Sequence, residues 1–297
     1  MNKTIYFITG PTGIGKSDFA INLSKKLNGE LINADSMQIY KELEIISARP
    51  RGSDIKKVQH HLYGYVSGKE RFNVDKWCKD AANKVHYLLK KKSSPIFVGG
   101  TGLYIDTLIN GITSIPNIPE DIKVESNNLY NKIGSEKFLK LVRELDYDST
   151  KNILQNDTQR LKRIWEVFHF TKKKLSYWKK NENKKFLNTK KFKIILFLPP
   201  RNKNYTKVNN RVLKMIDSGA IEEVNKLLKL NYSKEQVCNV ITSKLDGYYK
   251  GIVTGVDATA KTVDVKFLSH TSAAGVSTNV DYQPGGIYKF ANGLLIF

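Results

Sequence analysis

Apolar residues in the first hundred positions form short runs that alternate with longer stretches of helical spacing. Residues 3–9 are a β-branched and aromatic run, and residues 17–27 place apolar side chains at the spacing of an amphipathic helix. Residues 30–33 predict a second strand, 74–89 a second helix, and 95–98 a third, buried strand. Strands separated by helices predict an α/β fold, a parallel sheet with helices on both faces.

The pattern changes between residues 113 and 192. Strand signals disappear there, and apolar residues recur at helical spacing, above all in 136–145 and 157–170. The end of this stretch is strongly basic, since residues 171–193 hold ten lysines against one acid, Glu182. We therefore expect a helical, basic insertion within the α/β core.

A buried-strand pattern returns at residues 193–198, followed by helical spacing over 205–217 and 221–230. Beyond residue 240 the chain is rich in glycine and has short alternating runs, which are typical of β-structure. The predicted division is an α/β core, 1–112 and 193–240; a helical insertion, 113–192; and a β-rich C-terminal segment, 241–297.

The strongest motif follows the first predicted strand and opens the first predicted helix, as a phosphate-binding P-loop requires. It is a full GxxxxGK[ST] match, made of Gly10, Pro11, Thr12, Gly13, Ile14, Gly15, Lys16 and Ser17. Backbone N–H groups of such a loop curl around a phosphate, Lys16 neutralises an oxygen and the Ser17 hydroxyl is a ligand for Mg²⁺. The motif predicts a P-loop NTPase-like core and a phosphate ligand, without identifying that ligand as ATP.

Two further segments follow the next predicted strands. Asp35 comes directly after the second strand, at the sheet edge that faces the P-loop. It suits a Mg²⁺ partner or a general base, and capping of the next helix is the alternative. Residues 99–104, GGTGLY, follow the third strand, where glycines suit either a ligand or a tight turn. The adjacent His60 and His61 predict structural hydrogen bonds rather than a metal site.

A fourth segment, NDTQRLKRIWEV at 156–167, predicts a helix with two unlike faces. Arg160 and Arg163 are three residues apart and share one face, while Leu161 belongs to an apolar face with Ile164 and Trp165. A basic stripe backed by apolar residues suits contact with a phosphate backbone. A solvated helix face is the alternative.

Composition adds a charge argument. The 297 residues contain 49 Lys and Arg against 28 Asp and Glu, a net charge of +21 with a pI near 9.7. This suits a protein that binds a polyanion such as nucleic acid, although codon usage favouring lysine also explains it. Two cysteines make no disulfide framework, and no apolar run is long enough to span a membrane. We expect a cytoplasmic protein with no membrane association.

Taken together, GPTGIGKS, NADSMQIY, GGTGLY and NDTQRLKRIWEV, in this order and spacing, resemble the bacterial tRNA dimethylallyltransferase family. SARP at 47–50, QHHL at 59–62 and Asn210-Arg211 fit the same family, and the likeness extends from Met1 to about Val240. Such enzymes transfer the dimethylallyl group of dimethylallyl diphosphate to the exocyclic amine of the adenosine just 3′ of the tRNA anticodon. The resemblance implies tRNA and dimethylallyl diphosphate as partners and Mg²⁺ as cofactor. We also expect a monomer.

The resemblance also implies residue roles. The P-loop residues and Arg211 would hold the diphosphate, Asp35 would accept the proton of the attacking amine and Thr101 would hydrogen-bond the target nucleotide, with Lys16 stabilising the leaving group. The family's tRNA-contacting positions fall on Asp35, Ser36, Met37, Gln38, Thr101, Lys123, Gln159, Arg160, Leu161, Lys162 and Arg163. Lys123 stands where family members more often have arginine.

Two other functions fit parts of the pattern. A small-molecule or nucleotide kinase would use ATP at the P-loop without tRNA. A non-catalytic tRNA-binding protein would follow from the C-terminal segment, because residues 241–297 lack the basic, aromatic helical ending that the family shows. That segment carries a net charge of only +1, from five Lys and four Asp.

Overall fold

The structure is a computed structural model, and it describes most of the chain. The described residues are 3–70, 72–181, 183–188, 191–198, 201–230, 249–257, 262–270 and 287–291. The chain divides into two compact units, one formed by residues 1–105 with 189–297 and the other by residues 106–188. The boundaries of the second unit lie seven and four residues before the predicted boundaries at 113 and 192.

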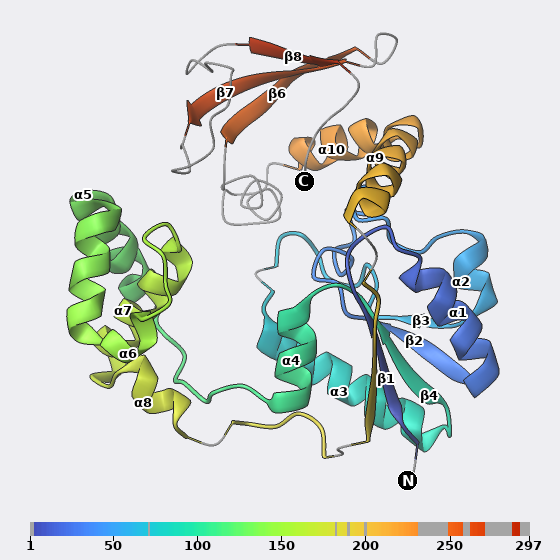
Figure 1. The fold of residues 1–297 in the computed structure, drawn as a ribbon, viewed down its shortest axis with the longest axis horizontal. Coiled ribbons are helices and arrows are strands. Elements are labelled where there is room, and N and C mark those ends of the chain that lie inside the picture. The colour runs from blue at the N-terminus through green and yellow to red at the C-terminus, as the bar shows by residue number, and fades with distance from the viewer. Residues whose placement is uncertain are drawn as a thin grey trace. The chain divides into compact units, whose positions relative to one another are not determined.

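A parallel five-stranded sheet forms the centre of the first unit (Figure 1). Its strands are β1 (Ile5–Thr9), β2 (Gly29–Asn33), β3 (His60–His61), β4 (Ser94–Val98) and β5 (Phe192–Leu196). They are arranged in the order β3-β2-β4-β1-β5, and every pairing is parallel. This confirms the predicted parallel α/β fold. The pattern did not predict β3, because two residues are too few to show alternation.

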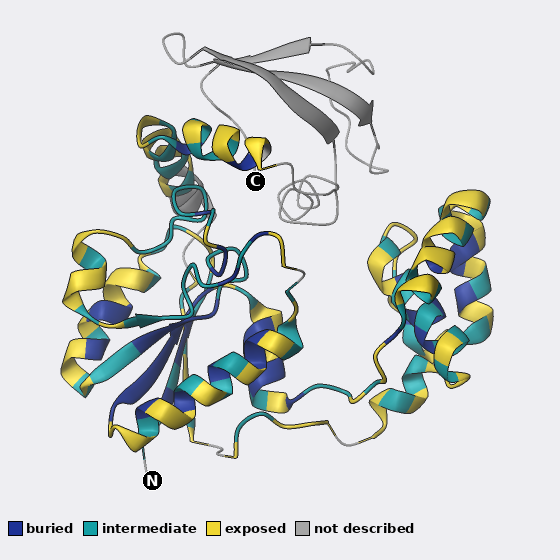
Figure 2. Cartoon of the chain, turned by 180° about the vertical axis from the view of Figure 1, so that it is seen from behind, coloured by how far each residue is buried: buried dark blue, intermediate teal, exposed yellow. Residues whose placement is uncertain are grey.

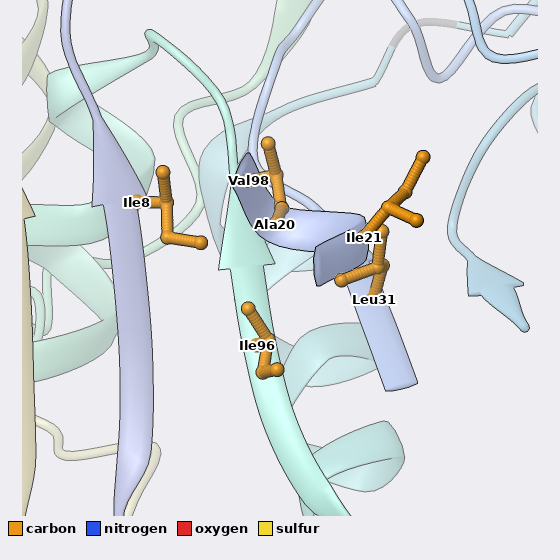
Figure 3. Packing of buried hydrophobic residues seen from close by; sticks show 6 residues of the cluster. All are labelled: Ile8, Ala20, Ile21, Leu31, Ile96 and Val98. Carbon is orange, nitrogen blue, oxygen red and sulfur yellow. The ribbon is translucent and has the colours of Figure 1, made fainter. Parts of the chain in front are cut away.

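Helix α1 (Lys16–Leu27) covers one face of the sheet. Ala20 and Ile21 of α1 pack against strand residues of the sheet, as Figure 3 shows for Ile8, Leu31 and Ile96. All these side chains are at least 95% buried, so the apolar stripe that predicted α1 supplies this part of the core.

Helix α3 (Val74–Lys90) packs against the sheet through the alternate strand residues. Successive side chains of a strand point to opposite faces, so Phe97 points away from the face that carries Ile96. Phe97 stacks on Phe7 at 4.8 Å between ring centroids and meets the edge of Trp77 from α3. Buried residues accordingly concentrate in the central strands and in the inner faces of the helices (Figure 2).

The remaining helices of this unit are short or lie late in the chain. They are α2 (Ser53–Lys57), α4 (Gly102–Asn110), which continues into the second unit, α9 (Arg201–Asp217) and α10 (Ala220–Lys229). Gly219, with φ +97°, separates α9 from α10, in the gap between the two predicted helices at 205–217 and 221–230. A left-handed backbone of this kind favours glycine, which has no Cβ.

The second unit is helical, as predicted. It contains α5 (Glu120–Leu145), α6 (Tyr147–Thr150), α7 (Thr158–Thr171) and α8 (Leu175–Lys179). Helix α5 is interrupted at Gly134, whose φ of 78° and ψ of 168° are not helical. Its second half packs on α7 through a cluster made of Phe138, Leu139, Val142, Leu161, Ile164 and Trp165.

The C-terminal segment contains a separate antiparallel sheet. Its strands are β6 (Tyr249–Asp257), β7 (Thr262–His270) and β8 (Ile287–Ala291), in that order. This confirms the predicted β-structure for the described part of 241–297. The last predicted run, 287–297, is described only as far as Ala291.

None of the helices in the described ranges combines the length and the apolar composition that crossing a membrane requires.

Candidate active site

The P-loop links β1 to α1 and takes the conformation that its glycines allow. Gly13 and Gly15 have φ values of 84° and 89°, in the left-handed region that glycine adopts without strain. A Cβ on Gly10 would lie 2.5 Å from the carbonyl oxygen of Phe197, beyond the end of β5. Glycine at Gly10 therefore lets the start of the P-loop approach the backbone of Phe197, which follows β5.

The Lys16 ammonium group lies inside the curve of this loop. Its Nζ donates to the carbonyl oxygens of Gly10 at 2.8 Å and Pro11 at 2.6 Å. Burial lowers the pKa of Lys16, while the nearby Asp35 carboxylate opposes this effect and Arg211 adds to it. The loop thus holds a partly desolvated cation, which interacts more strongly with an anion than an exposed lysine would.

Asp35 is positioned by the buried Asn33 at the end of β2. The Asn33 side chain accepts from the Asp35 backbone N–H at 2.8 Å and donates to the carbonyl oxygens of Asp35 and Leu62. One oxygen of the Asp35 carboxylate accepts from the Met37 N–H at 2.9 Å. Asp35 therefore sits in a turn whose backbone groups are internally hydrogen-bonded.

Thr101 lies against the same turn. Its backbone N–H donates to the Ala34 carbonyl at 3.2 Å, and its Oγ1 accepts from the Ser36 N–H at 2.9 Å. Its hydroxyl also donates to Ser36 Oγ at 3.3 Å. The close approach needs glycine nearby, because a Cβ on Gly99 would collide with the carbonyl group of Ala34. The second and third predicted segments thus meet at one edge of the sheet.

The P-loop and the Asp35 turn border one cavity of about 580 Å³, whereas Ser36, Met37 and Thr101 are not among the residues that line it. Asp35 and Gln38 line it together with most of the P-loop, which confirms that Asp35 faces the P-loop crevice. Helix α9 supplies another wall, through Lys207, Asn210, Arg211 and Lys214. Burial lowers the pKa of Arg211, and Asp35 opposes this shift. Lys16 and Arg211 therefore present two partly buried cations in the same space as the carboxylates of Asp35 and Asp18.

The sequence motifs do not include all the residues of this wall. Lys207 and Lys214 line the cavity beside Arg211, and their spacing of four and three residues places all three on one helix face. That spacing is a signal that the sequence contains. Ser47 and Ala48 also line the cavity, held by Gln38 Nε2, which donates to both carbonyl oxygens at 2.9 and 3.0 Å.

The histidine pair lies at strand β3, outside this cavity. His61 Nε2 is 2.7 Å from Glu30 Oε2, and His60 Nδ1 is 2.8 Å from the Val58 carbonyl oxygen. Both rings thus make structural hydrogen bonds, as the sequence predicts. No group of three or more His, Cys, Asp or Glu side chains suited to a metal ion occurs among the described residues.

The basic helix of the second unit is α7. Arg160 is largely exposed and pairs with Asp157 at 3.1 Å, while Arg163 is half-buried, with Glu166 at 4.0 Å. Lys162 donates to Asn127 at 2.7 Å and lies over the Tyr130 ring. Gln159 is exposed, and Lys123 of α5 pairs with Glu120 at 2.7 Å.

Leu161 corrects one prediction. Its side chain is fully buried between α5 and α7, so it is not available for contact with tRNA. The apolar periodicity of this helix predicts that Leu161 shares a face with Ile164 and Trp165. The structure confirms this, because all three belong to one buried cluster. Residues 159–163 span more than one turn of α7, so their side chains point in different directions and do not all face one partner.

Sequence comparison places these features in a known family. The profile of the IPP transferase family matches residues 38–260, and a second profile, isopentenyl transferase, matches residues 3–71. The chain belongs to the IPP transferase family. The match passes Val240, where the sequence motifs place the end of the likeness, and continues to residue 260.

Curated members of the IPP transferase family resemble this chain over most of its length. The tRNA dimethylallyltransferase of Pelagibacter ubique is 38% identical over 264 residues, which cover 88% of this chain and 84% of that protein. The tRNA dimethylallyltransferase of a Wolbachia pipientis strain from Culex pipiens is 40% identical over 234 residues, covering 78% and 77% of the two chains.

Solved structures of IPP transferases share the fold. A eukaryotic dimethylallyltransferase solved acting on tRNA gives a TM-score of 0.66 at 25% identity, over 79% of this chain and 59% of that one. The present chain thus matches less than two thirds of the eukaryotic enzyme. The tRNA isopentenylpyrophosphate transferase of Bacillus halodurans gives 0.55 at 26% identity, over 83% and 78% of the chains.

Proposed function

We propose that this protein is a tRNA dimethylallyltransferase, which transfers the dimethylallyl group of dimethylallyl diphosphate to the N6 amine of the adenosine 3′ to the tRNA anticodon. Curated relatives with 38–40% identity bear that name. The observation that carries the proposal is the cavity where the P-loop, Asp35 and Arg211 meet. In this cavity, Lys16 and Arg211 can bind the negatively charged diphosphate, and the carboxylate of Asp35 can accept a proton.

The reaction breaks the bond between C1 of the dimethylallyl group and the diphosphate oxygen, and forms a bond from C1 to N6. Pyrophosphate leaves, and negative charge on it increases in the transition state. Lys16 and Arg211 stabilise that charge, and partial burial strengthens their effect. The remaining glycines and backbone N–H groups of the P-loop hold the other phosphate oxygens.

Asp35 accepts the proton that N6 loses. Its carboxylate is fixed in the turn after β2, with one oxygen engaged by the Met37 N–H. Thr101 is fixed beside it by its contacts with Ala34 and Ser36. In the proposed reaction its hydroxyl hydrogen-bonds the target nucleotide. General-base assistance of this kind contributes about 10²–10⁴ in rate.

The chemistry of the cavity also fits Mg²⁺. This ion commonly keeps several waters and takes one or two protein oxygens together with substrate phosphates, so it needs no cluster of carboxylates. The Ser17 hydroxyl lines the cavity next to Lys16 and would hold the ion. When bound, Mg²⁺ supplies further neutralisation of the diphosphate oxygens.

Two groups of residues serve the tRNA. Ser36, Met37 and Gln38 directly follow Asp35, and Gln38 lines the cavity. We assign these three residues to the extruded adenosine, since a stacked base must leave the loop to react. On the second unit, Lys123, Gln159, Arg160, Lys162 and Arg163 contact the anticodon stem-loop. We further propose that the active unit is a monomer and that it works in the cytoplasm.

The proposal is tested by following pyrophosphate release from dimethylallyl diphosphate and Mg²⁺, with and without unmodified tRNA. Release that requires tRNA supports the transferase. Phosphoryl transfer from ATP without any need for tRNA would instead identify a kinase. Binding of tRNA with no pyrophosphate release at any donor concentration would identify a non-catalytic tRNA-binding protein.

A further inference from the structure

Glu223 of α10 caps three consecutive backbone N–H groups that are far from it in sequence. Its carboxylate accepts from Glu44 at 3.0 Å, Ile45 at 2.6 Å and Ile46 at 3.3 Å, across separations of 177 to 179 residues. Hydrogen bonds to an ionised group are among the strong ones in proteins. One side chain thus fixes α10 to the turn at residues 44–46.

This turn ends in a wall of the cavity. Ser47 and Ala48 follow it directly, and both line the space that holds Lys16 and Asp35. Ala48 has φ +48°, in the left-handed region that residues with a Cβ rarely adopt, so surrounding contacts must hold it there. Gln38 holds it on one side, and Glu223 fixes the turn that precedes it.

Helix α10 also follows directly after α9, which forms another wall of the cavity. Gly219 separates α10 from α9, and α9 carries Arg211 and Lys214 to the cavity. The end of α9 is closely connected to this break, because the Ser218 N–H donates to the Lys214 carbonyl at 3.0 Å. Glu223 therefore links the wall that carries Arg211 to the wall formed by Ser47 and Ala48.

We propose that Glu223 is a positioning residue for diphosphate binding. By fixing α10 to residues 44–46, it sets the spacing between Arg211 and the Ser47–Ala48 wall, and so places the Arg211 guanidinium on the diphosphate. Glu223 itself does not touch the substrate. The inference rests on the proposed function only in taking a diphosphate as the ligand of the P-loop.

Inorganic pyrophosphate with Mg²⁺ is the probe, because its binding does not depend on prenyl transfer. Glu223→Ala should weaken pyrophosphate binding about tenfold, as expected for losing charged hydrogen bonds. Glu223→Gln, which keeps one acceptor oxygen, should weaken it less. Glu222→Ala is the matched control on the same helix, where the side chain is exposed, and should bind as the wild type does.

The deciding readout is a double-mutant cycle with Arg211→Ala. If Glu223 acts by placing Arg211, the loss caused by Glu223→Ala should shrink to about twofold or less in the Arg211→Ala background. Steady-state kinetics should show a raised donor KM with an unchanged tRNA KM. The Glu223→Gln variant supports the same cycle if Glu223→Ala does not fold.

Two outcomes would overturn the inference. Additive losses in the cycle would mean that Glu223 does not act through Arg211. If Glu223→Ala lowers the melting temperature but leaves the pyrophosphate affinity unchanged, Glu223 only stabilises the packing of α10 and does not affect the diphosphate site. A wild-type protein that binds no pyrophosphate would instead contradict the proposed function, so the two failures are distinguishable.

Discussion

The Ser36 backbone N–H donates to Thr101 Oγ1 at 2.9 Å, which joins two turns that are 65 residues apart in sequence. One turn follows β2 and carries Asp35, and the other follows β4. Because parallel strands end at the same sheet edge, this bond places the proposed base and the proposed nucleotide contact side by side.

Replacing Asp35 should slow the transfer reaction while leaving the affinity for the donor diphosphate nearly unchanged. Asp35→Asn keeps the shape of the side chain but removes the proton acceptor, so kcat should fall about 10²–10⁴-fold. Pyrophosphate affinity should stay within about threefold, measured by calorimetry. Asp75→Asn, at a surface pair with Lys79, is the control. Activity of Asp35→Asn within threefold of wild type would remove Asp35 from the mechanism.

Replacing Lys16 should affect both donor binding and catalysis. In the proposed mechanism its ammonium group contacts the phosphates in the ground state and in the transition state, so Lys16→Ala should raise the donor KM and lower kcat together. Lys26→Ala, at the exposed end of α1, should change neither constant. Steady-state kinetics with varied dimethylallyl diphosphate measures both. An unchanged donor KM would show that the P-loop is not the donor site.

Two glycines after β4 offer a matched pair. A Cβ on Gly99 would collide with Ala34, whereas a Cβ on Gly100 would lie 3.4 Å from the Gly10 carbonyl oxygen, an ordinary contact. Gly99→Ala should therefore displace the Asp35 turn and lower both kcat and the melting temperature. Gly100→Ala should leave both nearly unchanged. Equal effects of the two substitutions would contradict the close approach of these turns.

Substitutions on the two faces of α7 should have different effects, one on tRNA binding and the other on the stability of the fold. Arg160→Ala should weaken tRNA binding and flatten its salt dependence by about one phosphate contact. Leu161→Ala should instead lower the free energy of unfolding by about 2–5 kcal/mol, because it opens a cavity in the core. Binding titrations at several salt concentrations and denaturant unfolding measure the two effects. If both variants change the salt dependence of tRNA binding equally, the assignment of Arg160 to tRNA contact and of Leu161 to core packing is wrong.

The His61–Glu30 contact predicts a pH dependence of stability. Burial lowers the pKa of His61, although the hydrogen bond to Glu30 opposes this, so protonation is easier in the unfolded chain. The free energy of unfolding should then fall as pH drops below about 6.5, where an unfolded histidine titrates. His61→Gln should reduce this slope, and His86→Gln, at an exposed position of α3, should not. Equal slopes in both variants would exclude His61 as the cause.

Local signals explain what the sequence predicts well. The P-loop, the buried strands and the apolar stripe of α1 are each encoded within a few residues, so their places in the sheet follow from the pattern. The meeting of Asp35 with the P-loop follows from the topology of a parallel sheet. Leu161 was wrong as a tRNA contact because a motif taken over as a block does not distinguish helix faces.

Contacts between distant residues are what the sequence does not predict. Glu223 reaches residues 44–46 across nearly 180 positions, and nothing in its own neighbourhood marks that role. Likewise Ser47 and Ala48 become a cavity wall only because Gln38 holds them there. Loop conformations of this kind depend on tertiary hydrogen bonds rather than on local propensity.

The most direct test of the proposed function identifies the product on the RNA. Unmodified tRNA is incubated with the protein, dimethylallyl diphosphate and Mg²⁺, then digested to nucleosides that are separated and weighed, with the Asp35→Asn variant in parallel. The account predicts dimethylallyl-adenosine from the position 3′ to the anticodon with the wild type, and nearly none with the variant. Adenosine that stays unmodified with wild-type protein that binds both tRNA and pyrophosphate would contradict it.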